Sequence, residues 1–371
     1  MTHSEKENRK QGSTMGKSRK TRFLTALKGG IPDRIPMYDF LFNKDLYNRL
    51  LGRRPENYNA RDAVECALAL DHDGVFVPFG GGAGYGRSFI STDTYRDEWG
   101  TTYRRTGASW PLDAPIDYPI SDTRDLVRLH VPDPSLAGRT AEIEIAAKME
   151  NDGIAILAGV QGPFTTAWHL MGYERICYSL YDDPGLLTEV FRISNEFFIE
   201  ASRRSVNSGC DGIWVSEDLG DSHSVLCSIE HFKRYVLPYL AELVERVDGL
   251  GVPAILHSCG NIMDFLGEIQ KTKICAVHPL QRTAGMDLKH MKREFGKRFC
   301  LIGNIDSSRT LAYGTLSDVE NEVRESIDIA AKGGGYVLAS DHSIHTGIPV
   351  ENAIQMFRTC KEYGRGIYGP Q

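Results

Sequence analysis

The sequence predicts a single (β/α)8 barrel of the TIM type, a fold of the α/β class, with a β-hairpin inserted after the second strand. From Arg22 to the C-terminus, short apolar segments alternate with amphipathic helical patterns, which is the order of repeated βα units. Most apolar segments lack polar alternation, as expected of parallel strands buried on both faces. Eight such segments are present, and eight strands close a barrel. A doubly wound open sheet is the alternative fold.

The candidate strands are three to six residues long and mostly rich in Val, Ile and Leu. In chain order they are Ile35–Tyr38, Gly74–Pro78, Ala155–Val160, Gly212–Val215, Ala254–Leu256, Ala276–Pro279, Phe299–Ile302 and Gly335–Leu338. The helical patterns between them include Asp182–Ser208, Ile229–Leu250 and Ser317–Lys332. Ser317 and Glu320 have the spacing of a capping box, which predicts the start of the last of these helices.

Two parts of the chain depart from the βα alternation. Aromatic and β-branched residues surround Trp99 and Gly100 in the stretch Tyr95–Thr106, which predicts the inserted hairpin. Residues 1–20 are polar and basic and have no hydrophobic period, so we expect a disordered tail. Residues 21–371 are then expected to form the barrel.

Composition excludes several classes of protein. The chain is 41% apolar and 25% charged, as soluble globular proteins are. A net charge of −6 gives no reason to expect nucleic acid as a partner, because a domain that binds the phosphate backbone needs a basic stripe. The eight cysteines are irregularly spaced, and we find neither a signal peptide nor an apolar run near the roughly 18 residues of a membrane span. We therefore expect a cytoplasmic protein with reduced thiols and no membrane partner. The oligomeric state is not predicted.

Polar residues follow most of the candidate strands, where a barrel gathers its catalytic groups. After the first strand comes Asp39, after the third Gln161, and after the fourth Glu217 and Asp218; the later ends carry His257, Ser258 and Cys259, then Asn304 and Asp306, then Asp341 and His342. Each residue alone could be a turn or capping residue. Together they predict an active site on this rim.

His257 and Cys259 stand out within this set because imidazole and thiolate are good zinc ligands. With His342 and Glu217 arriving from neighbouring strands, they predict one catalytic zinc per chain. The alternative is that Cys259 fills apolar space and His257 makes a hydrogen bond across the top of the barrel. The spacing of the residues leaves both interpretations open.

Three segments resemble the superfamily of uroporphyrinogen decarboxylase and the cobamide methyltransferases. They are Ala254–Asn261 (AILHSCGN), Gly162–Thr165 (GPFT) and Ala339–Pro349 (ASDHSIHTGIP). In the methyltransferase branch, a His-x-Cys pair and a cysteine after the eighth strand hold zinc. His257 and Cys259 match the pair, whereas His342 stands at the position of the later cysteine. The resemblance implies the barrel fold and a zinc-assisted methyl transfer.

The resemblance also implies roles for the residues on the rim. A site weighted towards nitrogen and oxygen ligands suits polarisation of an ether oxygen. We therefore expect a methyl group to move from a small methylated substrate, such as a methoxylated aromatic compound, to the corrinoid of a partner protein. His342 could instead protonate the leaving oxygen. The predicted catalytic residues are Glu217, His342, Asp341 and Asp306, and the predicted substrate-binding residues are Asp39, Phe40, Phe42, Tyr85 and Asn304.

Other functions stay open. A tetrapyrrole decarboxylase would need arginines near the first strand, and residues 37–44 contain none, although Asp73 matches the acid of that family. A methylcobamide-to-thiol or methylcobamide-to-folate methyltransferase is a further alternative, as is a non-catalytic barrel that binds a corrinoid. The sequence has no corrinoid-binding Asp-x-His-x-x-Gly segment, so any corrinoid is expected on another polypeptide.

Overall fold

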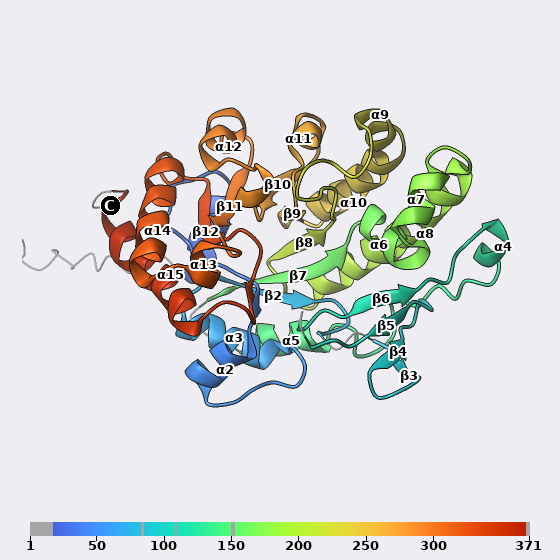
Figure 1. The fold of residues 1–371 in the computed structure, drawn as a ribbon, viewed down its shortest axis with the longest axis horizontal. Coiled ribbons are helices and arrows are strands. Elements are labelled where there is room, and N and C mark those ends of the chain that lie inside the picture. The colour runs from blue at the N-terminus through green and yellow to red at the C-terminus, as the bar shows by residue number, and fades with distance from the viewer. Residues whose placement is uncertain (1–17, 83–84, 108–109, 150–152, 369–371) are drawn as a thin grey trace, which may run out of the picture.

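A curved sheet of seven parallel strands forms the centre of the molecule, which has a TIM-type barrel fold (Figure 1). The structure is a computed structural model that describes residues 18–82, 85–107, 110–149 and 153–368. Across the sheet the strands follow the order β12-β11-β10-β9-β8-β7-β2. They are β2 (Gly74–Pro78), β7 (Ala155–Gln161), β8 (Gly212–Ser216), β9 (Ala254–His257), β10 (Ile274–His278), β11 (Cys300–Ile305) and β12 (Tyr336–Ser340). Each lies on a segment predicted from its apolar character.

The first predicted strand, Ile35–Tyr38, is not a strand in the structure. Met37 makes a single parallel bridge with Leu338 of β12, and its carbonyl accepts a hydrogen bond from the backbone N–H of Asp73, just before β2. This segment therefore joins the two ends of the seven-stranded sheet. A regular ladder does not form because Pro36 has no N–H and the N–H of Met37 donates to the Asp73 side chain.

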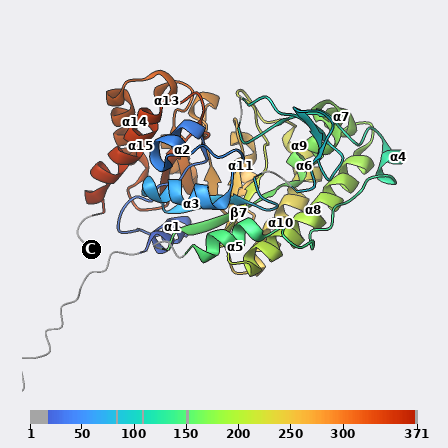
Figure 2. The same cartoon turned by 90° about the horizontal axis from the view of Figure 1, so that it is seen from below.

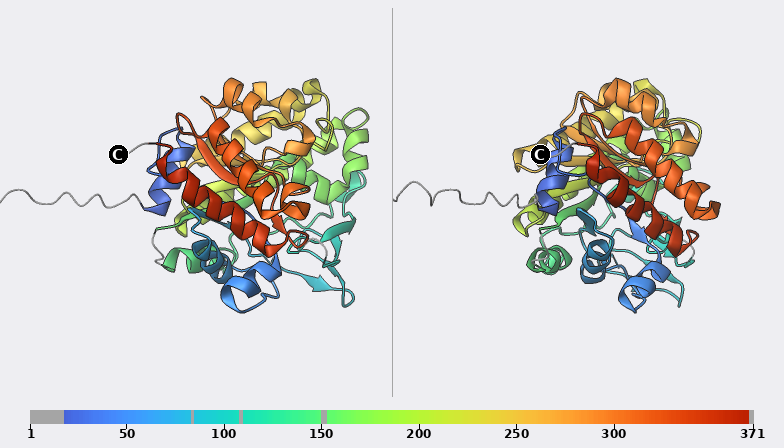
Figure 3. Two further views of the ribbon diagram at one scale, coloured as in Figure 1. Left: turned by 60° about the vertical axis from the view of Figure 1, so that its left-hand side comes forward. Right: turned by 90° about the vertical axis from the view of Figure 1, so that its left-hand side faces the viewer.

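Helices surround the sheet, and Figure 2 shows several of them, including α3, α5 and α8, on the side seen from below. They are α1 (Arg19–Leu27), α2 (Lys44–Leu51), α3 (Ala60–Ala69), α4 (Thr123–Leu126), α5 (Ala141–Lys148), α6 (Pro163–Met171), α7 (Tyr173–Ser179), α8 (Pro184–Asn207), α9 (Ile229–His231), α10 (Leu237–Gly249), α11 (Met263–Ile269), α12 (Leu288–Phe295), α13 (Thr310–Tyr313), α14 (Leu316–Ala330) and α15 (Val350–Tyr363). The orange and red helices α14 and α15 pack side by side (Figure 3). In the described part of the chain, no helix has both the length and the apolar character of a membrane span.

Two predicted boundaries need correction. Thr315 and Asp318 form the capping box of α14, two residues before the predicted pair Ser317 and Glu320. At the other end of the chain, α1 begins at Arg19 with Ser18 as its N-cap, inside the predicted tail. Residues 1–17 of that tail lie outside the described residues.

A four-stranded antiparallel sheet lies between β2 and β7 in the sequence, at the lower right of Figure 1. Its strands are β3 (Ser88–Phe89), β4 (Thr94–Arg96), β5 (Thr102–Arg104) and β6 (Ala114–Asp117). β4 and β5 pair across a turn that contains Trp99 and Gly100, within the stretch where a hairpin was predicted, and β3 and β6 extend the sheet at its two edges. We call β3–β6 the inserted sheet. The insertion is larger than a hairpin.

Ion pairs surround the segment directly before β2. Asp73, directly before β2, is buried, and its carboxylate accepts hydrogen bonds from Arg22 (2.5 Å) and Arg34 (3.0 Å). A neighbouring acid, Asp71, pairs with Arg19 and Lys361 at 2.7 Å each. These contacts place Asp73 at the end of the barrel opposite the polar rim.

Candidate active site

Asp218, His257 and Cys259 come together at the carboxyl ends of β8 and β9. Their candidate ligand atoms all lie within 4.8 Å of one another. His257 Nε2 is 3.4 Å from Cys259 Sγ and 3.9 Å from Asp218 Oδ1, and the Cys259 N–H donates to Asp218 Oδ1 at 3.0 Å. The parallel register of β8 and β9 produces the group, because Ser216 lies opposite His257.

The spacing within this group fits a zinc ion. Tetrahedral zinc with bonds of about 2.0–2.3 Å to nitrogen, oxygen and sulfur holds its ligand atoms roughly 3.3–3.8 Å apart. Two of the three separations, 3.4 and 3.9 Å, are close to that range, and none exceeds 4.8 Å. Imidazole, thiolate and carboxylate are also all established zinc ligands. The three residues can therefore hold a zinc ion and leave a fourth position open.

The ring of a second histidine, His278, is in hydrogen-bond contact with the ring of His257. The two residues lie opposite each other in the register of β9 and β10, and their Nδ1 atoms are 2.7 Å apart. Burial lowers the pKa of His257 to about 4 and the pKa of His278 well below its usual value. Both rings are therefore neutral near pH 7. His278 was not singled out in the sequence, where a lone apolar-flanked histidine carries little signal.

Glu217 does not lie with His257 and Cys259. Its Oε1 and Oε2 accept hydrogen bonds from the N–H groups of Phe164 and Thr165, each at 2.9 Å, at the start of α6. Burial raises the pKa of Glu217 to about 8 in spite of these bonds. The carboxylate beside His257 and Cys259 belongs instead to the next residue, Asp218. The two carboxylates differ in surroundings although they are one position apart, because consecutive side chains of an extended segment point in opposite directions.

His342 interacts electrostatically with His257 and Asp218 but is not a member of the group. Its Nδ1 is 2.9 Å from Ser343 Oγ. Burial lowers the pKa of His342, while the charge of Asp218 acts in the opposite direction. The neighbouring Asp341 accepts hydrogen bonds from Ser307 N (2.8 Å) and Ser307 Oγ (2.6 Å). Burial raises the pKa of Asp341 to about 6.

Three other predicted site residues make hydrogen bonds to backbone groups and lie outside the pocket that contains Asp218 and His257. Asp39 accepts hydrogen bonds from the N–H (2.7 Å) and hydroxyl (2.9 Å) of Ser340, and burial raises its pKa to about 7. Asn304 donates to the carbonyls of Leu280 and Met286. Asp306 accepts from the N–H groups of Ser308 (2.9 Å) and Arg309 (2.8 Å) and begins the turn after β11. None of these three residues lines the pocket described in the next paragraph.

A pocket of about 460 Å³ lies between the barrel and the inserted sheet, and Asp218 and His257 form part of its lining. The predicted residues Phe40, Phe42 and Tyr85 line it as well. Its other aromatic walls come from both parts of the molecule: Tyr58, Phe76, Phe79, Tyr95, Trp99, Tyr103, Phe197 and Phe198. This lining suits an aromatic ring. The loop Pro78–Tyr85 contributes Pro78 to Gly82 and Tyr85, and its residues 83 and 84 lie outside the described residues.

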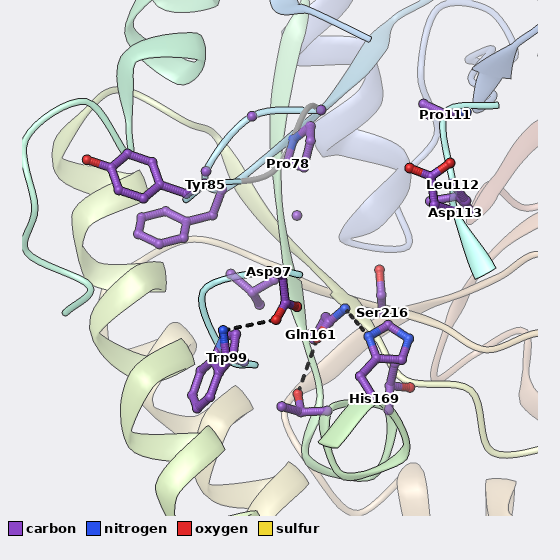
Figure 4. Close-up of a pocket in the computed structure, with 18 of the residues that line it drawn as sticks. Pro78, Tyr85, Asp97, Trp99, Pro111, Leu112, Asp113, Gln161, His169 and Ser216 are labelled. Carbon is purple, nitrogen blue, oxygen red and sulfur yellow. Dashed lines mark hydrogen bonds between the residues drawn. The ribbon is translucent and has the colours of Figure 1, made fainter. Parts of the chain in front are cut away.

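The polar part of the pocket centres on Gln161, His169 and Ser216 (Figure 4). Gln161 Nε2 is 3.2 Å from His169 Nδ1, and Gln161 Oε1 accepts from the Thr166 hydroxyl at 3.5 Å. Burial lowers the pKa of His169 to about 4, so the ring is neutral near pH 7. Gln161 was recognisable as the residue that follows the third predicted strand. His169 lies on α6 and had no sequence signal.

The two arginines of the pocket each face a carboxylate of the same pocket. Both terminal nitrogens of Arg139 donate to Glu98. Arg87 lies 3.8 Å from Asp113, with its guanidinium carbon 4.4 Å from the centre of the Tyr95 ring. The positive charge in the pocket is therefore already balanced by protein carboxylates.

Comparison with known proteins places the chain in a family. The family profile of uroporphyrinogen decarboxylase matches residues 113–363, more than half of the chain. The chain belongs to the uroporphyrinogen decarboxylase family. The predicted resemblance to the uroporphyrinogen decarboxylase superfamily is thereby confirmed. Proteins named methylcobamide:CoM methyltransferases are among the relatives, which agrees with the predicted resemblance to that branch.

Within the family, the relatives carry two kinds of name. A methylcobamide:CoM methyltransferase MtbA from Methanosarcina acetivorans is 24% identical over 60% of this chain and 62% of its own length. A uroporphyrinogen decarboxylase from Alkalilimnicola ehrlichii is 26% identical over 66% of this chain and 67% of its own length. The match to the methyltransferase thus spans about three fifths of that relative. A solved methyltransferase from Methanosarcina mazei has the same fold, with a TM-score of 0.71 and 21% identity over 93% of this chain and 99% of its own.

Proposed function

We propose that this family member is a corrinoid-dependent methyltransferase that takes a methyl group from a small methylated aromatic substrate and passes it to the corrinoid of a partner protein. One observation carries the proposal: an aromatic pocket is lined at one place by Asp218 and His257, two of the three residues that fit a metal ion. We call Asp218, His257 and Cys259 the metal group. A methoxyl oxygen on a substrate ring held in this pocket would be able to reach a metal ion bound by the metal group.

His257, Cys259 and Asp218 would hold one zinc ion per chain. Bound there, zinc acts as a Lewis acid that stabilises the oxygen from which the methyl group departs. His342 would supply a fourth ligand or a hydrogen bond to the leaving oxygen, since it interacts electrostatically with Asp218 and His257 and takes the place of the later cysteine of the family's methyltransferases. Glu217 has a different role, which is to anchor the start of α6 through two backbone N–H groups.

The pocket residues orient the substrate. Phe40, Phe42 and Tyr85 contact the ring, and Gln161 and His169 offer hydrogen bonds to a polar substituent. The methyl–oxygen bond breaks, the methyl group passes to the partner's corrinoid, and the leaving oxygen keeps the electron pair and takes a proton. Asp341 and Asp306 support the loops after β12 and β11 that carry His342 and its neighbours.

Two observations weigh against decarboxylation of a tetrapyrrole. The pocket arginines already face Glu98 and Asp113, so they offer little to a substrate with many carboxylates. Asp73, the residue that resembles the acid of the decarboxylases, is paired with Arg22 and Arg34 at the opposite end of the barrel. A second candidate is methyl transfer from a methylcobamide to a thiol, because relatives are named for that reaction.

The first experiment measures zinc content and methyl transfer together. Zinc-loaded wild-type protein should hold about one zinc per chain and convert cob(I)alamin to methylcobalamin with 2-methoxyphenol as the donor. His257→Ala and Cys259→Ala should lose both properties, whereas Ile90→Ala, at an exposed position directly after β3, should keep them. Methyl transfer without bound zinc would disprove the metal's role. Methylation of 2-mercaptoethanesulfonate by methylcobalamin, with no reaction of the ether, would favour the second candidate.

A further inference from the structure

We propose that His278 is a positioning residue that accepts a hydrogen bond from Nδ1–H of His257 and thereby presents the lone pair of His257 Nε2 to a metal bound with Cys259 and Asp218. The inference rests on the proposed metal site. It goes further by assigning a role to a residue outside the metal group and by predicting one tautomer for each ring.

The contacts of His257 define the two sides of its ring. Nδ1 lies 2.7 Å from His278 Nδ1, and Nε2 faces Cys259 Sγ at 3.4 Å and Asp218 Oδ1 at 3.9 Å. A contact of 2.7 Å between two ring nitrogens requires one proton between them, so one ring donates and the other accepts. The metal group can use His257 only through an unprotonated Nε2. The proton of His257 must then be on Nδ1, and His278 must accept it.

This arrangement also assigns the tautomer of His278. Its Nδ1 is the acceptor, so its own proton is on Nε2. His278 Nε2 is buried and has no hydrogen-bond partner among the described residues, so no contact there demands the opposite tautomer. When no metal is bound, the Cys259 thiol can donate a hydrogen bond to His257 Nε2. The hydrogen bonds then all run from Cys259 to His257 and from His257 to His278, so the tautomers are the same with and without metal.

The surroundings of His278 keep its ring in place. The side chain is completely buried, and its centroid lies 4.8 Å from Trp214, 5.3 Å from Phe40 and 6.0 Å from Tyr38. A ring packed on several sides cannot turn away without displacing these neighbours. Partners of this kind, which orient a metal-binding histidine from behind, typically change metal affinity by roughly 10–100-fold when they are lost.

Two substitutions separate this role from simple packing. His278→Leu fills much of the same space but offers no acceptor, and we expect its zinc affinity, measured by competition with a chelator, to fall by roughly 10–100-fold. His278→Asn places an amide oxygen near the position of Nδ1, so it should recover most of the affinity. Tyr38→Phe is the matched control, because the Tyr38 ring contacts His278 and the buried Tyr38 hydroxyl has no hydrogen-bond partner among the described residues. The Tyr38→Phe protein should bind zinc as the wild type does.

A second measurement tests the tautomers without metal or activity. Nitrogen-15 NMR of histidine-labelled apoprotein should show the His257 proton on Nδ1 and the His278 proton on Nε2. The reverse pattern would overturn the proposal, as would wild-type zinc affinity in His278→Leu. Equal losses in the Leu and Asn variants would also overturn it, because the effect would then be one of packing. Failure of methyl transfer with these results intact would count against the proposed function alone. If His278→Leu does not fold, the zinc affinity of His278→Asn and the tautomers seen by NMR test the proposal.

Discussion

Glu217 and Asp218 are neighbours in the chain, yet their carboxylates have different partners. Glu217 accepts from two backbone N–H groups of α6 and is completely buried, whereas Asp218 lies with His257 and Cys259 and lines the pocket. Buried acceptors of this kind support structure, and a partly exposed carboxylate beside imidazole and thiolate suits a metal. The difference predicts opposite outcomes for two substitutions that preserve side-chain shape.

Asp218→Asn should weaken zinc binding and leave stability nearly unchanged. Glu217→Gln should do the reverse, since an amide nitrogen would face one of the two backbone donors. A buried donor left without an acceptor costs about 1–3 kcal/mol of unfolding free energy. Zinc affinity and urea unfolding of both variants test the pair. A stable Glu217→Gln that has lost zinc would show that Glu217, rather than Asp218, is the ligand.

At the scale of elements, the inserted sheet determines the shape of the pocket. Tyr95 and Tyr103 of its strands and Trp99 of the turn between them line the pocket together with Phe40 and Phe42 of the barrel. The Thr101 hydroxyl donates to the His169 carbonyl at 2.7 Å and so joins the turn of the sheet to α6. The barrel strands β2 and β7 pair directly with each other, so the insertion serves the pocket and not the barrel sheet.

Replacement of a wall residue should therefore affect binding of an aromatic compound. Tyr103→Ala is expected to weaken binding of 2-methoxyphenol by about 1 kcal/mol, the order of one aromatic contact. Ile90→Ala should have no effect because Ile90 is 60% exposed and does not line the pocket. Calorimetric titration of both variants provides the comparison. Equal affinities would mean that the ring binds elsewhere.

On the scale of the whole molecule, Asp71 connects distant parts of the chain. It pairs with Arg19 of α1 and Lys361 of α15, both at 2.7 Å, and lies 3.9 Å from Arg34. Burial by itself would raise the pKa of Asp71, but Lys361, Arg34 and Arg19 outweigh it and lower the pKa to about 2. Because an unfolded aspartate has a pKa of about 3.9, the ionised group stabilises the folded state above that pH.

This stabilisation should disappear as the pH falls from about 4 to about 2, because Asp71 is protonated in both states below the lower value. Asp71→Asn should accordingly be less stable than wild type at pH 6 and approach it near pH 2. Asn also tolerates the positive φ of 65° at this position. Urea unfolding across this range checks the trend. Glu351→Gln, which breaks an exposed ion pair with Arg49, should show little change at any pH. A constant difference between Asp71→Asn and wild type would contradict the explanation.

The sequence by itself determined the barrel, because seven of its strands lie on apolar segments whose character depends only on burial on both faces. It also singled out His257 and Cys259 as a pair, and the structure places His257 Nε2 3.4 Å from Cys259 Sγ. Ile35–Tyr38 was misjudged because an apolar pattern does not reveal that Pro36 and the Asp73 carboxylate prevent a ladder.

Only the tertiary structure decided which residues surround His257. Asp218 rather than Glu217 lies beside His257 because the backbone at the start of α6 donates hydrogen bonds to the Glu217 carboxylate. The contact with His278 depends on the register of β9 and β10. The aromatic wall of the pocket depends on where the inserted sheet packs. Such arrangements are set by contacts between elements distant in sequence, which local patterns of hydrophobicity and spacing do not encode.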